Sequence, residues 1–116
     1  MTPPAATSGS LADLPADEPY PGVVRRTVDG EGLTASTYRF EPGASFPVHR
    51  HAQEQLTIVH EGSVSVQLGE EATALGAGSW WVVPGWVEHG LTAGSDGASL
   101  TAVIVPRRTA PPEIIG

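Results

Sequence analysis

The stretch Gly43–Gln55, GASFPVHRHAQEQ, carries two histidines two residues apart, His49 and His51, and His89 follows thirty-odd residues later. Side chains two residues apart on a β-strand point to the same face of the sheet. Two imidazoles on one face, joined by a third from a distant segment, are a donor set that divalent transition metals favour. The sequence therefore predicts a metal site on a β-scaffold.

Short alternating segments bounded by turn residues surround this stretch. They alternate between apolar and polar residues or are rich in β-branched ones, as β-strands are, and no segment has a helical period. Many short strands at regular spacing favour a sandwich or a small barrel. The strand candidates are Leu33–Phe40, Val48–His51, Leu56–His60, Ser63–Leu68, Ala72–Leu75, Trp80–Val83 and Leu100–Val105.

The amino-acid composition favours one fold class and excludes several kinds of function. The 116 residues suit one domain, and 14 glycines, 11 prolines and 16% charged residues favour an all-β chain with many turns. A net charge of −7 argues against nucleic-acid binding, which needs a positive surface. The chain has no cysteine, which excludes disulfides and thiolate zinc sites, and no apolar run of the ~20 residues that span a membrane. We expect a soluble, cytoplasmic protein.

The chain divides into three parts by composition. Residues 1–22 are rich in Pro, Ala, Ser and Asp and predict a flexible N-terminal arm, residues 23–106 form the β-domain, and residues 107–116 form a C-terminal tail. Exposed strand edges and the apolar pair Val23-Val24 suggest a homodimer in which the N-terminal strand packs across the interface.

The histidine stretch resembles the first motif of the cupin family, G-x5-H-x-H-x3,4-E-x6-G. Gly43, His49, His51 and Gly62 occupy its fixed positions at the right spacing, and Gln55 stands where the motif has Glu.

The second motif of that family, G-x5-P-x-G-x2-H-x3-N, is present in the expected order. Gly78, Pro84 and His89 match it, whereas Trp86 stands at the second glycine position and Ala93 at the Asn position. The resemblance covers roughly residues 33–105. It implies a small antiparallel β-barrel, the jelly-roll-like double-stranded β-helix of cupins, with one divalent metal ion inside.

By this resemblance, His49, His51 and His89 are metal ligands. The fourth ligand is open between Gln55, through its side-chain oxygen, and its neighbour Glu54, through a register slip, and strand parity favours Gln55. Three imidazoles and an oxygen suit Zn, Ni, Fe, Mn or Co without choosing among them.

A glutamine ligand affects the expected chemistry. A neutral amide leaves the full charge of the dication facing the pocket, which favours polarisation of a carbonyl or enol. Similar three-His, one-Gln arrangements occur in the pectin-degradation cupin that opens unsaturated uronates and in polyketide-cyclase cupins, both non-redox. The former also has a D-x-F-x-P-x-R pattern, of which Pro106 and Arg108 are present here while Ala102 and Ile104 replace the Asp and Phe.

The sequence thus predicts a metal-dependent isomerase, cyclase or lyase acting on a small oxygenated carbonyl or enol substrate. A metal-dependent dioxygenase and a non-catalytic, small-molecule-binding or sensing cupin are the alternatives. Tyr38 and Arg108 are candidate catalytic side chains, and Trp86 and Phe40 are candidate substrate contacts. Each also has a plain structural interpretation, as a core aromatic, a surface aromatic or a solvated cation. His60 has the opposite strand parity to Gln55 and is expected on the surface.

Overall fold

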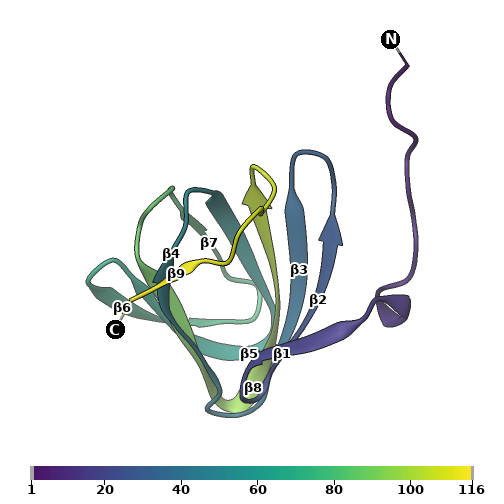
Figure 1. Ribbon diagram of the computed structural model, residues 1–116. Helices are drawn as coiled ribbons and strands as arrows, with labels where there is room; N and C mark the ends of the chain where they lie inside the picture. The colour runs from purple at the N-terminus through teal and green to yellow at the C-terminus, as the bar shows by residue number, and fades with distance from the viewer. Residues whose placement is uncertain (1, 116) are drawn as a thin grey trace.

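The computed structural model describes residues 2–115, which form one curled antiparallel β-sheet (Figure 1). This all-β, antiparallel architecture confirms the expected fold class. One short 3-10 helix, η1, precedes the strands. The elements, in chain order, are η1 (Leu11–Asp13), β1 (Ala16–Tyr20), β2 (Val23–Asp29), β3 (Thr34–Phe40), β4 (Ser45–Arg50), β5 (Glu54–Leu68), β6 (Glu71–Gly76), β7 (Trp80–Val83), β8 (His89–Val105) and β9 (Glu113–Ile114).

Two long strands, β5 and β8, pair along their whole lengths and form the spine of the sheet. Their register shifts near Gly62, where the ribbon bends. Gly62 has φ +79° and Gly97 has φ +72°. Residues other than glycine rarely adopt this backbone conformation. A Cβ on Gly62 would also overlap the Gly97 carbonyl. The second glycine of the first motif is therefore required because the two backbones touch at this bend.

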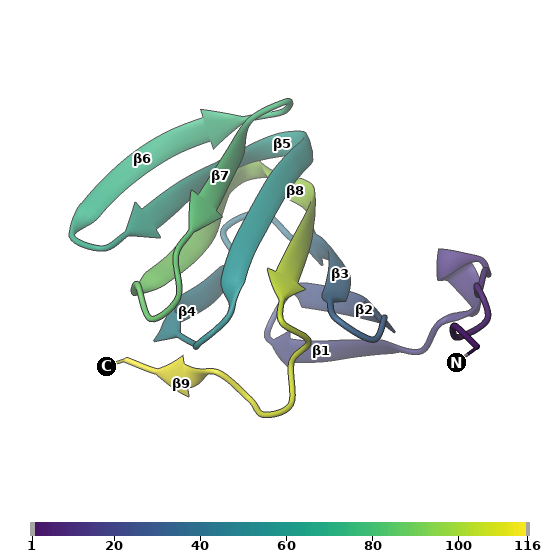
Figure 2. The same cartoon turned by 90° about the horizontal axis from the view of Figure 1, so that it is seen from above.

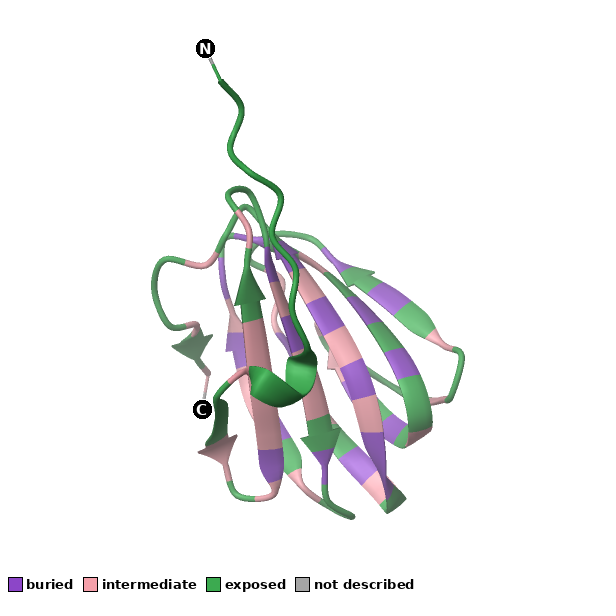
Figure 3. Cartoon of the chain, turned by 90° about the vertical axis from the view of Figure 1, so that its right-hand side faces the viewer, coloured by how far each residue is buried: buried purple, intermediate pink, exposed green. Residues whose placement is uncertain are grey.

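The bend divides the sheet into two walls. On one wall β8 pairs with β3, which leads to β2 and β1, and on the other it pairs with β4. The first half of β5 pairs with β7 and the second half with β6 (Figure 2). Alternate side chains of each strand face the space between the walls, and the alternation of buried and exposed residues follows the strands closely (Figure 3). This inner face holds the core, which is built from Val23, Phe40, Phe46, Val59, Val64, Val66, Trp81, Val83, Ala93, Ala98 and Leu100.

The ends of the chain join the sheet more than the sequence suggested. The predicted arm, residues 1–22, contains β1, which pairs with β2, so the sheet begins before residue 23. The predicted tail, residues 107–116, contains β9, which pairs with the outer edge of β4. Both strands are short and rich in charged or proline residues, which hides them from a search for alternating patterns. Residues 2–10 extend away from the body (Figure 1).

Two of the expected strands are one continuous strand in the structure. Leu56–His60 and Ser63–Leu68 both lie in β5, because Gly62 bends this strand without ending it. In the described residues, no helix is long and apolar enough to cross a membrane.

Candidate metal centre

Three histidines meet between the two walls. His49 lies on β4 and His89 begins β8, and these two residues are register partners, while His51 follows directly after β4. All three are buried, at 4 to 6% exposure. Their candidate ligand atoms lie within 4.8 Å of one another. The structure thus brings together residues from two distant segments around one point.

Backbone carbonyl groups fix the proton on each imidazole. Nδ1 of His49 lies 2.8 Å from the Pro47 carbonyl oxygen, and Nδ1 of His89 lies 2.8 Å from that of Val87. Nδ1 of His51 lies 3.0 Å from the Gln53 carbonyl oxygen. A carbonyl oxygen accepts only, so each Nδ1 carries the hydrogen and donates it. Each Nε2 is left with its lone pair, which is the form in which imidazole binds a metal ion.

The three histidines are uncharged, in addition to carrying their single hydrogen on Nδ1. Burial and the neighbouring His89 lower the pKa of His49 to about 3, and burial lowers the pKa of His89 to about 4. Burial also lowers the pKa of His51. The positive charge of Arg108 lowers the pKa of all three. Three neutral imidazoles can bind a cation without first releasing protons.

Gln55 supplies an oxygen to this cluster. Its Oε1 lies 3.1 Å from Nε2 of His51 and 3.2 Å from Nε2 of His89. Its Nε2 donates to Oγ1 of Thr57 at 2.9 Å, which turns the amide so that the oxygen faces the histidines. Glu54, the alternative ligand, pairs with Val105 on the other face of β5 and is exposed. The geometry therefore places Gln55, and not Glu54, beside the three imidazoles.

These four side chains fit a divalent transition metal. The donors are three Nε2 lone pairs and one amide oxygen, which lie close together and are all uncharged. Without a cation, Oε1 of Gln55 would face two nitrogens that offer lone pairs and no hydrogen, which is an unfavourable arrangement for buried polar atoms. A metal ion bound at this point satisfies all four.

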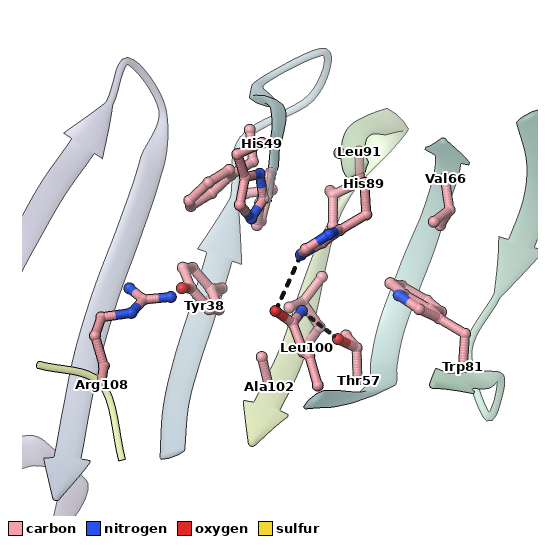
Figure 4. Close-up of a pocket in the computed structure, with 14 residues that line it drawn as sticks. Tyr38, His49, Thr57, Val66, Trp81, His89, Leu91, Leu100, Ala102 and Arg108 are labelled. Atoms are coloured by element: carbon pink, nitrogen blue, oxygen red, sulfur yellow. Dashed lines mark hydrogen bonds between the residues drawn. The ribbon is translucent and has the colours of Figure 1, made fainter. Parts of the chain in front are cut away.

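The cluster opens into a cavity between the walls (Figure 4). Most of its lining is apolar, including Phe40, Phe46, Trp81 and Leu100. No carboxylate lines it among the described residues. Aside from the metal-site residues, the polar side-chain groups of the lining belong to Tyr38, Thr57, Trp81 and Arg108.

Arg108 enters the cavity from the segment after β8. Its backbone N–H donates to Oγ1 of Thr34 at 3.0 Å, which anchors the residue at the start of β3. Its Nε is buried without a hydrogen-bond partner, and no carboxylate within residues 2–115 forms an ion pair with it. In Figure 4 its guanidinium group points toward the Tyr38 hydroxyl. The cavity therefore holds a cation without a counter-ion.

Tyr38 lies near a second arginine, Arg25, its register partner on β2. Arg25 forms an ion pair with Asp17 of β1, with contacts of 2.6 and 3.1 Å. This pair raises the pKa of Arg25 and lowers that of Asp17. Arg25 was not among the residues expected at the site, because the sequence of the segment that carries Asp17 predicted an arm outside the sheet.

The two predicted substrate contacts, Phe40 and Trp86, lie in different parts of the structure. Phe40 is buried and lines the cavity. Trp86 is 59% exposed and does not line it; its indole belongs to a groove on the other side of His51, formed with the C-terminal segment. Its φ of +65° explains why the family pattern has glycine at this position. Trp81 and Thr57, which the sequence analysis did not select, line the cavity instead.

Comparison with protein families gives one match over most of the β-domain. The family model described as the cupin domain matches residues 36–106. No curated protein sequence matches the chain significantly.

Solved structures of the same fold cover most of the chain. An RmlC-like cupin from Shewanella frigidimarina has a TM-score of 0.82 at 26% identity, over 90% of this chain and 94% of that one. KdgF from a Halomonas species has a TM-score of 0.78 at 27% identity, and the match covers 87% of this chain and 96% of KdgF. Oxalate decarboxylase from Bacillus subtilis has a TM-score of 0.83 at 22% identity; the match covers 96% of this chain and 33% of the decarboxylase, and it concerns the fold.

Proposed function

This chain belongs to the cupin family, and from that premise we propose that it is a metal-dependent enzyme for non-redox chemistry on small oxygenated acids. The observation that carries the proposal is the pairing, in one cavity, of a neutral four-donor cluster with the unpaired cation of Arg108. The bound metal ion would act as a Lewis acid toward a carbonyl or enol oxygen of the substrate.

Arg108 supports a substrate with a carboxylate. Its guanidinium group has donors in a planar arrangement that matches a carboxylate, and the cavity offers it no anion of its own. A bound carboxylate would satisfy the buried Nε and neutralise the charge that already lowers the pKa values of the histidines.

Tyr38 is the side chain best placed to move a proton. Its hydroxyl group lies in the cavity near Arg108, and Arg25 lies beside it on the neighbouring strand. A tyrosine hydroxyl at this position can act as a general acid toward a substrate oxygen. Phe40, Phe46 and Trp81 would exclude water around the apolar part of the substrate.

The similarity to KdgF suggests unsaturated uronates as the first substrates to test. The resemblance is incomplete, because Ala102 and Ile104 stand where the related pattern has Asp and Phe, and Ala102 adds only a methyl group to the cavity. We therefore extend the substrate class to enolisable 2-oxo acids of similar size.

The test is a substrate panel on metal-loaded protein. The protein is purified without an affinity tag, its metal is identified by elemental analysis, and each acid is followed by proton NMR together with dissolved oxygen. We expect one acid to be isomerised, cyclised or cleaved without oxygen consumption, and Arg108→Gln to raise KM for the acid more than it lowers kcat. Oxygen consumption matched to product would instead identify a dioxygenase.

A non-catalytic binding protein is the second candidate, because no carboxylate base lines the cavity in the part of the chain that the structure describes. Calorimetry on the same panel separates the two. A ligand that binds tightly and is recovered unchanged, and whose binding is lost in Arg108→Gln, would favour a binding or sensing role over an enzyme.

A further inference from the structure

Two arginines without an acidic partner lie on the outer face of the sheet, which is turned away from the cavity. All six basic residues of the chain are arginines. Within residues 2–115, three of them form ion pairs with carboxylates: Arg25, Arg50 and Arg107. Of the others, Arg108 lies in the cavity, whereas Arg26 and Arg39 line one groove on the outer face. In a chain of net charge −7, this groove gathers positive charge against the overall excess of acids.

Strand register places the two arginines close together. Arg26 of β2 is the register partner of Thr37 on β3, and Arg39 lies two residues beyond Thr37 on the same face. Diagonal neighbours of this kind have Cβ atoms roughly 7–8 Å apart, which long side chains can span. Two cations at this separation repel each other, and an anion between them would turn that repulsion into attraction.

Hydroxyl groups from the neighbouring strands form the floor of the groove. Thr101 of β8 is the register partner of Thr37, and Ser99 is that of Arg39, so their side chains share the outer face and line the groove. His60 of β5 lies on the far side, with Nε2 2.7 Å from Oγ1 of Thr101. A hydroxyl group can accept one hydrogen bond and still donate its own hydrogen to a ligand. The groove therefore presents hydrogen-bond donors from four strands.

Acidic side chains do not line this groove in the part of the chain that the structure describes. Glu41, Glu61 and Asp96 line a different groove at the bend of the sheet, which Arg39 borders, and none of them forms an ion pair with Arg39. An anion in the outer groove would thus meet hydrogen-bond donors and apolar groups without a facing carboxylate.

The short helix η1 closes one side of the groove. Nη1 of Arg26 donates to the carbonyl oxygen of Leu11 at 3.3 Å, and η1 lies in front of the strands in Figure 3. This hydrogen bond orients the guanidinium group and leaves most of its five N–H donors available. Leu11 and Val24 add apolar surface to the groove beside Arg26.

We propose that this groove binds a small phosphate monoester, with the phosphate group between Arg26 and Arg39 and the organic part against Leu11 and Val24. The guanidinium and hydroxyl donors approach from several strands. They suit the oxygens of a tetrahedral phosphate better than the two coplanar oxygens of a carboxylate. The sheet separates this groove from the metal cavity, since the side chains that line the cavity from these strands point inward. The site is therefore additional to the substrate pocket.

Titration of the zinc-loaded full chain with phenyl phosphate tests the proposal, with the backbone amide signals followed by proton–nitrogen NMR. We expect the signals of Thr37, Ser99 and Thr101 to shift along one saturable curve with a millimolar or lower Kd. Arg26→Gln and Arg39→Gln should each raise this Kd at least tenfold, because each removes a charged hydrogen-bond donor. Both side chains lie outside the core, and circular dichroism would verify that the variants fold.

Benzoate tests the preference for phosphate, because it has the same ring with a planar carboxylate. We expect it to bind at least tenfold more weakly than phenyl phosphate. Equal binding of the two anions would overturn the assignment of the ligand as a phosphate monoester. Inorganic phosphate should bind more weakly than phenyl phosphate, because it has no organic part to contact Leu11 and Val24. Inorganic phosphate that bound as tightly would overturn the apolar part of the site.

Two further variants separate the groove from other sources of binding. Arg107→Gln removes the same charge from a residue that does not line the groove, and Arg108→Gln removes the cation of the cavity. We expect both to bind phenyl phosphate in the groove as the native chain does. Shifts confined to cavity residues such as Gln55 and His89 would overturn the proposal. It would also be overturned by an equal loss of affinity in Arg107→Gln and Arg26→Gln, or by the absence of saturable shifts at about 20 mM phenyl phosphate.

Discussion

Oε1 of Gln55 lies 3.2 Å from Nε2 of His89, although the two residues are 34 positions apart and lie on different strands. The contact forms because Gln55 faces inward from β5 and His89 starts β8, where β4 brings His49 alongside. It joins the two family motifs at a single point, and the chain departs from the family pattern at this contact by having an amide in place of a carboxylate.

Replacement of that amide by a carboxylate should tighten metal binding. In Gln55→Glu, one negative charge would lie next to the dication in a buried site, where such charge pairs are strong. We expect at least a tenfold lower Kd for Zn²⁺, measured by competition with a chromogenic chelator. Glu54→Gln is the control, because Glu54 is exposed on the other face, and it should leave the Kd unchanged. A larger effect at position 54 than at position 55 would contradict the assignment of the fourth ligand.

Thr57 should affect metal binding without contacting the metal. Its Oγ1 accepts the hydrogen bond from Nε2 of Gln55, and this bond holds the amide oxygen toward the histidines. Thr57→Val keeps the shape of this fully buried residue and removes the acceptor. Loss of such an outer partner typically costs about 10- to 100-fold in metal affinity, and we expect a loss in that range.

The control for this variant is Thr73→Val on β6, whose side chain is exposed. To distinguish positioning from simple destabilisation, the apo proteins are unfolded in urea. If Thr57→Val lowered stability by the ~1–3 kcal/mol expected for an unpartnered amide but left the Kd for Zn²⁺ unchanged, then Thr57 would have no positioning role.

The histidine cluster should make the apo protein sensitive to mild acid. In the folded chain the pKa of His49 is about 3 and that of His89 about 4, whereas unfolded histidines titrate near 6.5. Below pH 6.5 the unfolded state therefore binds more protons than the folded state, and stability falls as the pH falls. Each histidine that stays neutral should contribute a slope of about 1.4 kcal/mol per pH unit.

Urea unfolding of the apo protein between pH 7 and pH 5 measures this slope, in a window above the range in which carboxylates titrate. His60→Gln serves as the control, because His60 is exposed, and its slope should equal that of the native chain. A free energy of unfolding that stayed constant across the window would show that the three histidines become protonated without unfolding the protein.

Much of the site could be predicted from the sequence because its parts are local patterns. The parity of His49 and His51, and of Gln55 against Glu54, follows from strand geometry, and the glycines of both motifs mark bends that the structure contains. The meeting of His89 with these residues was expected from the family resemblance, since strand register over such a separation is not encoded locally.

The parts that could not be predicted depend on long-range packing. Trp86 was expected near the substrate because it stands at the second glycine position of the second motif, but its left-handed backbone turns the indole away from the cavity. Arg25 and Asp17 meet near Tyr38 because β1 folds back onto β2, and the polar sequence of β1 gives no alternating pattern to indicate this.

Two residues with positive φ, Gly62 in the bend of β5 and Trp86 in a turn, should respond in opposite ways to substitution. At Gly62, φ is +79° and a Cβ would overlap the Gly97 carbonyl group, so we expect Gly62→Ala to cost more than ~2 kcal/mol of unfolding free energy. At Trp86, φ is +65° with a side chain already present, and the indole is 59% exposed, so we expect Trp86→Gly to relieve strain.

Trp86→Ala is the matched control, since it removes the indole and keeps the Cβ that strains the backbone. Thermal and urea unfolding should therefore rank Trp86→Gly above Trp86→Ala by about 1 kcal/mol, the preference of a left-handed residue for glycine. If Trp86→Ala were as stable as Trp86→Gly, the backbone at this turn would not be strained, and the glycine of the family motif would need a different explanation, such as the close approach of a partner to the turn.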